Sequence, residues 1–345
     1  MAALQGTVGV PTGHPAGWTG YHFRPVVTRS ALPRPRGGDL QGYDGSMNVA
    51  ITGASGFIGA ALVREARARG HAVSALVRET SRTDHIEGLV DRLVVGTHED
   101  PDVHQQLLDG VDAVIHNSFD WHSLKQGDLV EHMRSNMVGS IDLLQAAGDR
   151  HFVYMSSIAV HHHMHPDWQG RIDETHPIRP GNFYGALKAA IEAHMWAANA
   201  ERGQSVSSIR PCAVYGIDPT LKRSIGWPII TRLRKDARFD RAGGGKFVHV
   251  EDVAAATVAC LGNERATPAV YNLVDCYARW GDWATIASEL LGIDAEIDLT
   301  SPPAPRNMFL DDQVRQDLGV GLDRGLEGVR EHLRQLIECM DGPGA

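Results

Sequence analysis

Tyr184 and Lys188 are the two residues whose types and spacing most directly suggest acid–base chemistry. They lie four positions apart in a segment with helical periodicity, and residues four apart share one face of a helix. An ammonium group beside a phenol stabilises the phenolate, and a tyrosine biased in this way passes a proton at neutral pH. The same spacing also occurs by chance in helices where the phenol is exposed and the amine is solvated. Other sequence features must therefore show whether this pair has a catalytic role.

A glycine-rich segment, 53–59, supplies that context because it stands between an apolar run at 47–52 and a helical stretch that ends near Arg69. Its first glycine permits a tight turn, the second lets a pyrophosphate approach the backbone, and the third lets the helix pack closely on the strand. The N-terminus of the following helix offers N–H donors and a partial positive charge. The segment therefore predicts a dinucleotide site. The expected cofactor contacts here are Gly53, Ser55, Gly56, Phe57, Ile58 and Gly59.

The elements that must position these residues alternate along the chain between apolar strands and helical stretches. Such alternation favours an α/β fold with a doubly wound parallel sheet, the Rossmann arrangement. After the first strand, further strands are expected at 71–77, 92–95, 113–116, 152–156, 206–210, 246–250 and 269–274. Late helices are expected at 251–261, 280–291 and 326–340.

Composition excludes several other classes of protein. The 345 residues are 43% hydrophobic and 22% charged, which is ordinary globular usage, and the formal net charge of -9 would repel nucleic acid. The longest apolar stretch, 49–63, is too short and too interrupted to cross a bilayer, so no membrane span is predicted. The four cysteines lie far apart in the sequence, which favours reduced thiols in a cytoplasmic protein.

Residues 1–46 are rich in Gly, Pro and Arg and show no sustained apolar periodicity. Such a segment cannot bury enough surface to offset the entropy of ordering, so we expect a flexible N-terminal extension. Whether it is a leader, a transit peptide or the product of a misplaced start before Met47 stays open.

Taken in order, these features resemble the extended branch of the short-chain dehydrogenase/reductase superfamily, the epimerase/dehydratase-like group. The resemblance extends from Met47 to the C-terminal helix. Besides the glycine segment and the Tyr184/Lys188 pair, the segments that carry it are 112–116, 136–140, 156–160, 210–216 and 247–253.

The resemblance assigns roles to particular residues. It implies that Ser157 orients the substrate carbonyl, that Lys188 also holds the nicotinamide ribose, and that Asn136 anchors a water relay to Lys188. It places His116 on the strand beneath the cofactor. It also implies that the backbone around Pro211 and Val214 meets the nicotinamide carboxamide.

Departures from the family pattern bear on cofactor and substrate. NAD-using members carry an acidic residue after the second strand, whereas this chain has Arg78 followed by Arg82, and an arginine there can pair with a 2′-phosphate. NADP(H) is therefore favoured, with NAD as the alternative. Dehydratases follow the catalytic hydroxyl with an Asp-Glu pair that is absent after Ser157. The diphosphate-clamping arginine of the epimerases is replaced by the stretch 243–246.

The histidines in the segment 161–165 raise the question of a metal. Three consecutive histidines cannot all face one ion in a regular element, and no carboxylate or cysteine stands at a fixed offset. We expect no metal and a polar loop beside the substrate cleft.

These observations predict an NADP(H)-dependent oxidoreductase that reduces a ketone or aldehyde of a small molecule, with Tyr184 as general acid. The alternatives are an NAD-dependent sugar-nucleotide epimerase and a non-catalytic NADP-binding sensor. We expect a cofactor domain over 47–216 and 246–274 and a substrate lobe over 217–245 and 275–340. By resemblance, the helices around 136–145 and 184–199 are candidates for a homodimer interface.

Overall fold

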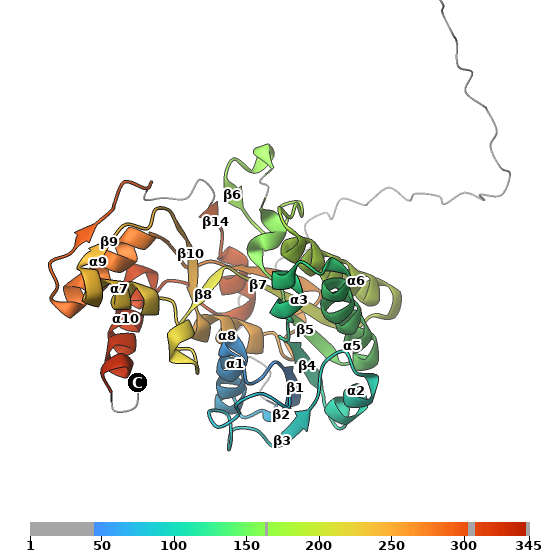
Figure 1. Cartoon of the computed structure of the whole chain (residues 1–345). Coiled ribbons are helices and arrows are strands. Elements are labelled where there is room, and N and C mark those ends of the chain that lie inside the picture. The colour runs from blue at the N-terminus through green and yellow to red at the C-terminus, as the bar shows by residue number, and fades with distance from the viewer. Residues whose placement is uncertain (1–44, 163–164, 303–307, 343–345) are drawn as a thin grey trace, which may run out of the picture. The chain divides into compact units, whose positions relative to one another are not determined.

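A computed structural model describes residues 45–162, 165–302 and 308–342 of the chain. At its centre lies a seven-stranded sheet, β11-β7-β5-β4-β1-β2-β3, in which every neighbouring pair of strands runs parallel (Figure 1). This confirms the predicted doubly wound parallel sheet. The strands are β1 (Asn48–Thr52), β2 (Ala72–Val77), β3 (Arg92–Val95), β4 (Ala113–His116), β5 (His151–Met155), β7 (Val206–Pro211) and β11 (Ala269–Leu273).

The central strands are almost entirely buried, and most of their side chains are apolar. In β1, Val49, Ala50 and Ile51 have no exposed surface, and all five residues of β5 are buried. Strands with continuous apolar sequence are typical of parallel sheets that are covered on both faces. The sheet therefore requires a helical layer on each side.

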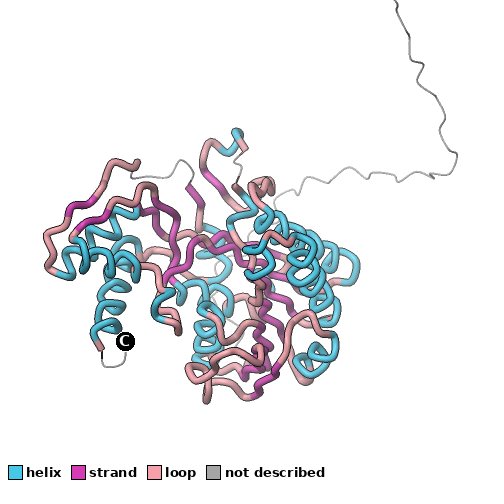
Figure 2. Tube along the Cα trace, in the orientation of Figure 1, coloured by secondary structure: helices cyan, strands magenta, loops and turns pink. Residues whose placement is uncertain are grey.

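Two groups of helices supply these layers, as the cyan tubes on either side of the magenta strands show (Figure 2). One apolar cluster joins the sheet to α1 (Phe57–Ala68) and α8 (Val250–Val258), and a second joins it to α2 (Pro101–Leu108), α5 (Gly139–Ala147) and α6 (Phe183–Arg202). No helix among the described residues is long and apolar enough to cross a membrane.

A third apolar cluster lies in the C-terminal part of the chain. It contains α7 (Trp227–Asp236), α9 (Trp280–Leu291) and α10 (Gly325–Asp341), and the fully buried Trp283 is its largest side chain. The predicted boundary between a cofactor domain and a substrate lobe stays a prediction. The short strands are β6 (Arg171–Ile172), β8 (Ala213–Tyr215), β9 (Arg238–Phe239), β10 (Gly244–His249), β12 (Cys276–Arg279), β13 (Glu296–Ile297) and β14 (Met308–Phe309).

Short helical segments complete the described chain. Two α-helical turns, α3 (Trp121–Gln126) and α4 (Leu129–His132), run into the π-helical η1 (Met133–Val138). The other short segments are η2 (Ile158–His161), η3 (Pro166–Trp168), η4 (Leu221–Arg223), η5 (Glu264–Ala266) and η6 (Val314–Leu318). Residues 1–44, which make up most of the predicted N-terminal extension, lie outside the described residues.

The order of the strands places the candidate site. From β1 the chain proceeds outward to β2 and β3, and it then returns to β4 on the other side of β1. In open parallel sheets, ligands bind beyond the carboxyl ends of the strands at such a reversal. The loops that follow β1 and β4 therefore border the expected binding crevice.

Candidate active site

The loop between β1 and α1 has backbone geometry that only glycine accommodates. Gly53 has a φ of +65°, and a Cβ atom on Gly59 would lie 2.0 Å from the Gly53 carbonyl oxygen. Gly56 is the N-cap residue of α1, where no described side chain caps the helix and the first turn holds no acidic residue. The free N–H groups of this turn suit an anion such as a pyrophosphate. Of the other predicted contacts, Ser55, Phe57 and Ile58 are all half-buried.

The loop after β4 lies against this glycine turn. Thr52 Oγ1 accepts hydrogen bonds from the backbone N–H groups of Asn117 and Ser118, both at 3.0 Å. A Cβ atom on Gly53 would lie 3.2 Å from the Ser118 backbone, so the two loops meet closely. The carboxyl ends of β1 and β4 are thereby joined at the point where the strand order reverses.

His116 lies inside this junction rather than on its surface. Its imidazole is fully buried, and its ring nitrogens are hydrogen-bonded to Thr52 Oγ1 and to Ser140 Oγ, each at 2.8 Å. Burial lowers the pKa of His116 well below its usual value, so the ring is neutral. The side chain supports the crevice from beneath, and direct contact with a cofactor stays a prediction.

Arg78 follows the last residue of β2 and is exposed. Its guanidinium forms no ion pair with any residue that the structure describes. Arg82, by contrast, forms two hydrogen bonds with Asp84, at 2.9 and 3.2 Å. Of the two arginines expected near a 2′-phosphate, Arg82 is thus the one already paired with a described carboxylate.

Close packing of α6 against η2 brings Tyr184 and Ser157 together. Gly185 makes this possible, because a Cβ atom there would lie 2.4 Å from the Ala159 carbonyl oxygen. Ser157 is the N-cap residue of η2 and accepts the N–H of Ala159 at 3.1 Å. The hydroxyls of Ser157 and Tyr184 are hydrogen-bonded, which favours the phenolate form. The predicted pair therefore shares one site.

Lys188 is fully enclosed beside this pair. Its Nζ donates to the Met155 carbonyl oxygen at 2.6 Å and lies 4.6 Å from the centre of the Tyr154 ring. The centre of the Tyr184 ring is 5.8 Å from Nζ. Burial lowers the pKa of Lys188 to about 7. Proton uptake by this lysine thus falls in the physiological range.

Two opposing effects of its surroundings act on the pKa of Tyr184. Burial raises it, and the hydrogen bond from Ser157 offsets only part of that increase. The Lys188 ammonium donates to the Met155 carbonyl, and a lowering of the Tyr184 pKa by Lys188 stays a prediction.

Asn136 is buried within η1, where its side chain is hydrogen-bonded to the backbone of Asp120. Its Oδ1 accepts the N–H of Asp120 at 2.6 Å, and its Nδ2 donates to the Asp120 carbonyl at 3.0 Å. The Asn136 carbonyl accepts the Ser140 hydroxyl. The amide therefore fixes the backbone at the start of α3, and the predicted water relay stays a prediction.

Two aromatic residues that sequence reasoning missed cover Tyr184. The Trp121 ring is stacked on the Tyr184 ring with centroids 5.1 Å apart, and the Phe119 ring meets it edge-on at 5.2 Å. Trp121 is 49% exposed. The available signal was two aromatic residues directly after a buried strand, in a loop that a doubly wound sheet places at its carboxyl edge.

Pro211 and Val214 lie across from Ser157. The Pro211 carbonyl is 3.5 Å from Ser157 Oγ, and Val214 is in β8, where it pairs with Val248. The structure thus places the β7–β8 segment beside the candidate catalytic hydroxyls, although contact with a nicotinamide stays a prediction.

The histidine segment departs from the expected polar loop at its first residue. His161 is fully buried and accepts a hydrogen bond from Arg210 at 3.0 Å. His163 lies outside the described residues. Within the described ranges, no group of three His, Cys, Asp or Glu side chains is arranged to hold a metal.

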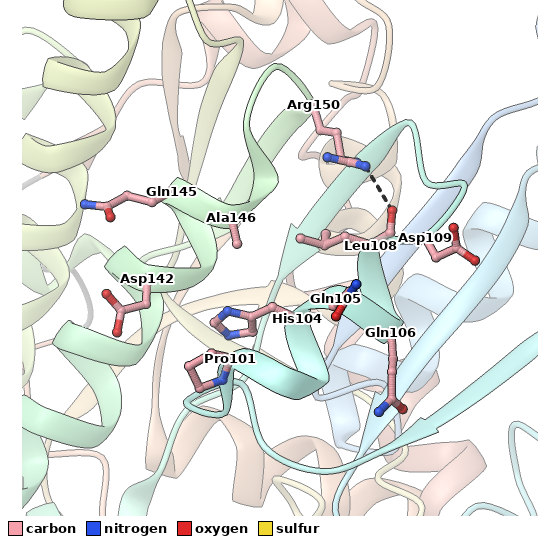
Figure 3. Close-up of a pocket in the computed structure, with 10 residues that line it drawn as sticks. All are labelled: Pro101, His104, Gln105, Gln106, Leu108, Asp109, Asp142, Gln145, Ala146 and Arg150. Carbon is pink, nitrogen blue, oxygen red and sulfur yellow. Dashed lines mark hydrogen bonds between the residues drawn. The ribbon is translucent and has the colours of Figure 1, made fainter.

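An open surface hollow lies apart from these residues, between α2 and α5 (Figure 3). Arg150 spans it, donating to the Leu108 carbonyl at 3.0 Å. None of its lining residues belongs to the predicted site.

Comparisons with known proteins agree with this geometry. A model described as the NAD dependent epimerase/dehydratase family matches residues 49–273. A putative dihydroflavonol 4-reductase from Synechocystis sp. is 30% identical over 311 residues, which cover 83% of this chain and 85% of that protein. A 3 beta-hydroxysteroid dehydrogenase/Delta 5-->4-isomerase from Mycobacterium tuberculosis is 30% identical over 225 residues, 60% of each chain.

Solved structures show the same fold. A UDP-glucose 4-epimerase from Thermotoga maritima superimposes with a TM-score of 0.73 at 18% identity, covering 86% of this chain and 100% of that one. At this level of identity the likeness concerns the fold alone.

Proposed function

Because this chain belongs to the NAD-dependent epimerase/dehydratase family, within the extended short-chain dehydrogenase/reductase superfamily, we propose that it is an NADP(H)-dependent carbonyl reductase. Its substrate would be a ketone or aldehyde of a small molecule. The observation that carries the proposal is the meeting of Tyr184, Ser157 and Lys188 beside the reversal in strand order.

The residues around the crevice fit a dinucleotide. A Cβ atom on Gly53 or Gly59 would crowd the neighbouring backbone, so the turn needs both glycines. The first turn of α1 has free N–H groups that can bind a pyrophosphate. Arg78 would receive the 2′-phosphate of NADP(H). When bound, the cofactor supplies the hydride that adds to the carbonyl carbon.

The side chains of the chain would manage the proton and the charge on oxygen. Ser157 donates a hydrogen bond to the substrate oxygen and holds it near Tyr184. The Tyr184 phenol gives up its proton to that oxygen, and the adjacent Lys188 ammonium stabilises the phenolate that remains. Asn136 contributes by fixing Asp120 and hence the aromatic residues over Tyr184.

Two features favour reduction of a substrate without a nucleotide diphosphate. Where the epimerase pattern has a clamping arginine, Gly244 lies so close to β12 that a Cβ atom would be 2.3 Å from the Ala278 carbonyl. The two neighbouring cations already contact aromatic rings. The Arg241 guanidinium lies 4.0 Å from the centre of the Trp280 ring, and Lys246 is half-buried beside aromatic rings. The relatives at 30% identity are also named as reductases and dehydrogenases.

We further propose a cytoplasmic homodimer. All four cysteines carry free thiols, the state that a reducing compartment maintains. Exposed apolar side chains, Val138 on η1 and Trp196 on α6, lie in the predicted interface helices. Sedimentation of the purified protein tests the dimer.

The experiment that tests the function is an NADPH-depletion assay against a panel of ketones, aldehydes and nucleotide sugars. Net oxidation of NADPH with at least one ketone or aldehyde is expected, and the corresponding alcohols serve as controls. Isomerisation of a nucleotide sugar without net oxidation would establish an epimerase instead. Cofactor binding without turnover of any compound would favour a sensor.

A further inference from the structure

Glu192 is a fully buried carboxylate on α6, one helical turn after Lys188. Ser208 Oγ donates to its Oε1 at 2.7 Å, and Arg210 donates to both of its oxygens at 2.9 and 2.5 Å. Burial alone would raise the pKa of Glu192, but the charge of Arg210 holds it below the usual value. The carboxylate is therefore ionised inside the protein.

A neutral histidine connects this ion pair to the turn that begins at Ser157. Arg210 Nη1 donates to His161 Nε2 at 3.0 Å, and His161 is the last residue of η2. Burial lowers the pKa of His161 to about 4, which leaves its ring nitrogen free to accept that proton. Through β7, the network links the turn that begins at Ser157 to the helix that presents Lys188.

The titratable groups around the Lys188 ammonium come from several elements. Those that interact with it are Tyr154 on β5, Tyr184 and Glu192 on α6, His98 before α2, His116 on β4 and His132 on α4. Burial lowers the pKa of all three histidines, so they are neutral. The carboxylate of Asp120 instead accepts the first N–H groups of α3. Among the described residues, Glu192 is thus the carboxylate whose charge raises the pKa of Lys188.

We propose that Glu192 is a positioning residue for the reaction, because its buried charge keeps the Lys188 ammonium protonated while Arg210 and His161 fix that charge relative to Ser157. The inference rests on the proposed role of Lys188. A lysine without this counter-charge would lose its proton at a lower pH, since burial already penalises its charged form. Glu192 itself touches neither substrate nor cofactor in this account.

The test is the pH profile of kcat/KM in Glu192→Gln, compared with Glu201→Gln on the exposed end of the same helix. In Glu192→Gln the alkaline limb is expected to move to lower pH by about one unit, the lower end of the effect of a nearby opposite charge. Glu201→Gln is expected to retain the wild-type profile. An unmoved limb in a folded Glu192→Gln protein would overturn the proposal.

A second variant and a second readout keep the test decisive. Glu192→Gln leaves the buried Arg210 without its counter-charge, so the double variant Glu192→Gln/Arg210→Gln removes both charges and is expected to move the limb in the same direction. NADPH titration across pH, followed by fluorescence, is expected to show the same shift in affinity. A shift in binding without turnover of any substrate would refute the proposed function alone, whereas unshifted profiles in the double variant would refute the role of Glu192.

Discussion

At the scale of single residues, the half-buried phenol of Tyr184 lies against two aromatic rings and is hydrogen-bonded to Ser157. Replacing it with Phe keeps the ring packing and removes only the hydroxyl group, and with it the proton. Tyr184→Phe is expected to lower turnover by roughly two orders of magnitude or more, the usual scale for a lost general acid. NADPH affinity, measured by titration, is expected to stay close to that of the wild type. Turnover near the wild-type level would remove Tyr184 from the mechanism.

Arg78 carries the prediction about cofactor choice. A charge-assisted hydrogen bond is worth roughly 1.5–3 kcal/mol, which corresponds to about a tenfold to hundredfold preference for NADPH over NADH. Titration of Arg78→Ala is expected to show most of this gap lost. Arg82→Ala is the matched control and is expected to have the smaller effect, because Arg82 is paired with Asp84.

Two results would contradict the assignment of the 2′-phosphate site. Equal affinities of the wild-type protein for the two cofactors, or a preference for NADH, would remove the argument for NADP. A larger loss in Arg82→Ala than in Arg78→Ala would place the phosphate on the other arginine.

Residue spacing predicted that the candidate pair Tyr184 and Lys188 shares one helix face, but it did not predict the surroundings of the pair. Tyr184 and Lys188 belong to one helix, where periodicity fixes their relation, and Ser157 follows a recognisable strand. The stacking of Trp121 on Tyr184 joins segments more than sixty positions apart, and no local pattern encodes such a contact. The Asn136 amide likewise bonds to Asp120 because η1 turns it toward α3.

At the scale of elements, the site depends on how closely α6 approaches η2. Helix propensity alone would make Gly185→Ala stabilising by up to about 1 kcal/mol. The added Cβ atom would instead lie 2.4 Å from the backbone oxygen of Ala159, which cannot move aside as a side chain can. Thermal unfolding is expected to show a net loss of about 1–3 kcal/mol. Turnover is expected to fall as well, because Tyr184 and Ser157 separate.

Ala186→Gly serves as the control for this prediction, because Ala186 is the next residue of α6 and is exposed. It is expected to cost about 0.5–1 kcal/mol through propensity alone and to leave turnover unchanged. A Gly185→Ala protein that is more stable than wild type and fully active would show that the close approach has no functional role.

The order of the main strands and helices could be predicted from apolar runs and from the glycines that end them. Each central strand is buried on both faces and therefore has a mostly apolar sequence. The short strands β6, β9, β13 and β14, two residues each, were not predicted, since such elements form only through pairing with distant segments. The π-helical turn η1 was not predicted either, because its sequence reads as ordinary helix.

At the scale of the whole molecule, the first strand of the sheet begins at Asn48, and the Met47 carbonyl already accepts the N–H of Ala72 at 2.9 Å. Deletion of residues 1–46 removes one exposed hydrogen bond from Ser46 to Gly70 among the described contacts. Melting temperature and NADPH affinity are expected to change little, because a Gly/Pro-rich segment contributes little to a core. A large drop in melting temperature would show that the extension docks on the domain.

The central claim is net reduction of a carbonyl, and transfer of a labelled hydride tests it most directly. NADPH that carries deuterium at both positions of C4 is incubated with a ketone or aldehyde that the panel assay identifies. The expected result is one deuterium on the carbinol carbon of the product for each NADPH oxidised, with loss of transfer in Tyr184→Phe. An isomerised substrate that carries no deuterium, with the NADPH unchanged, would contradict the account.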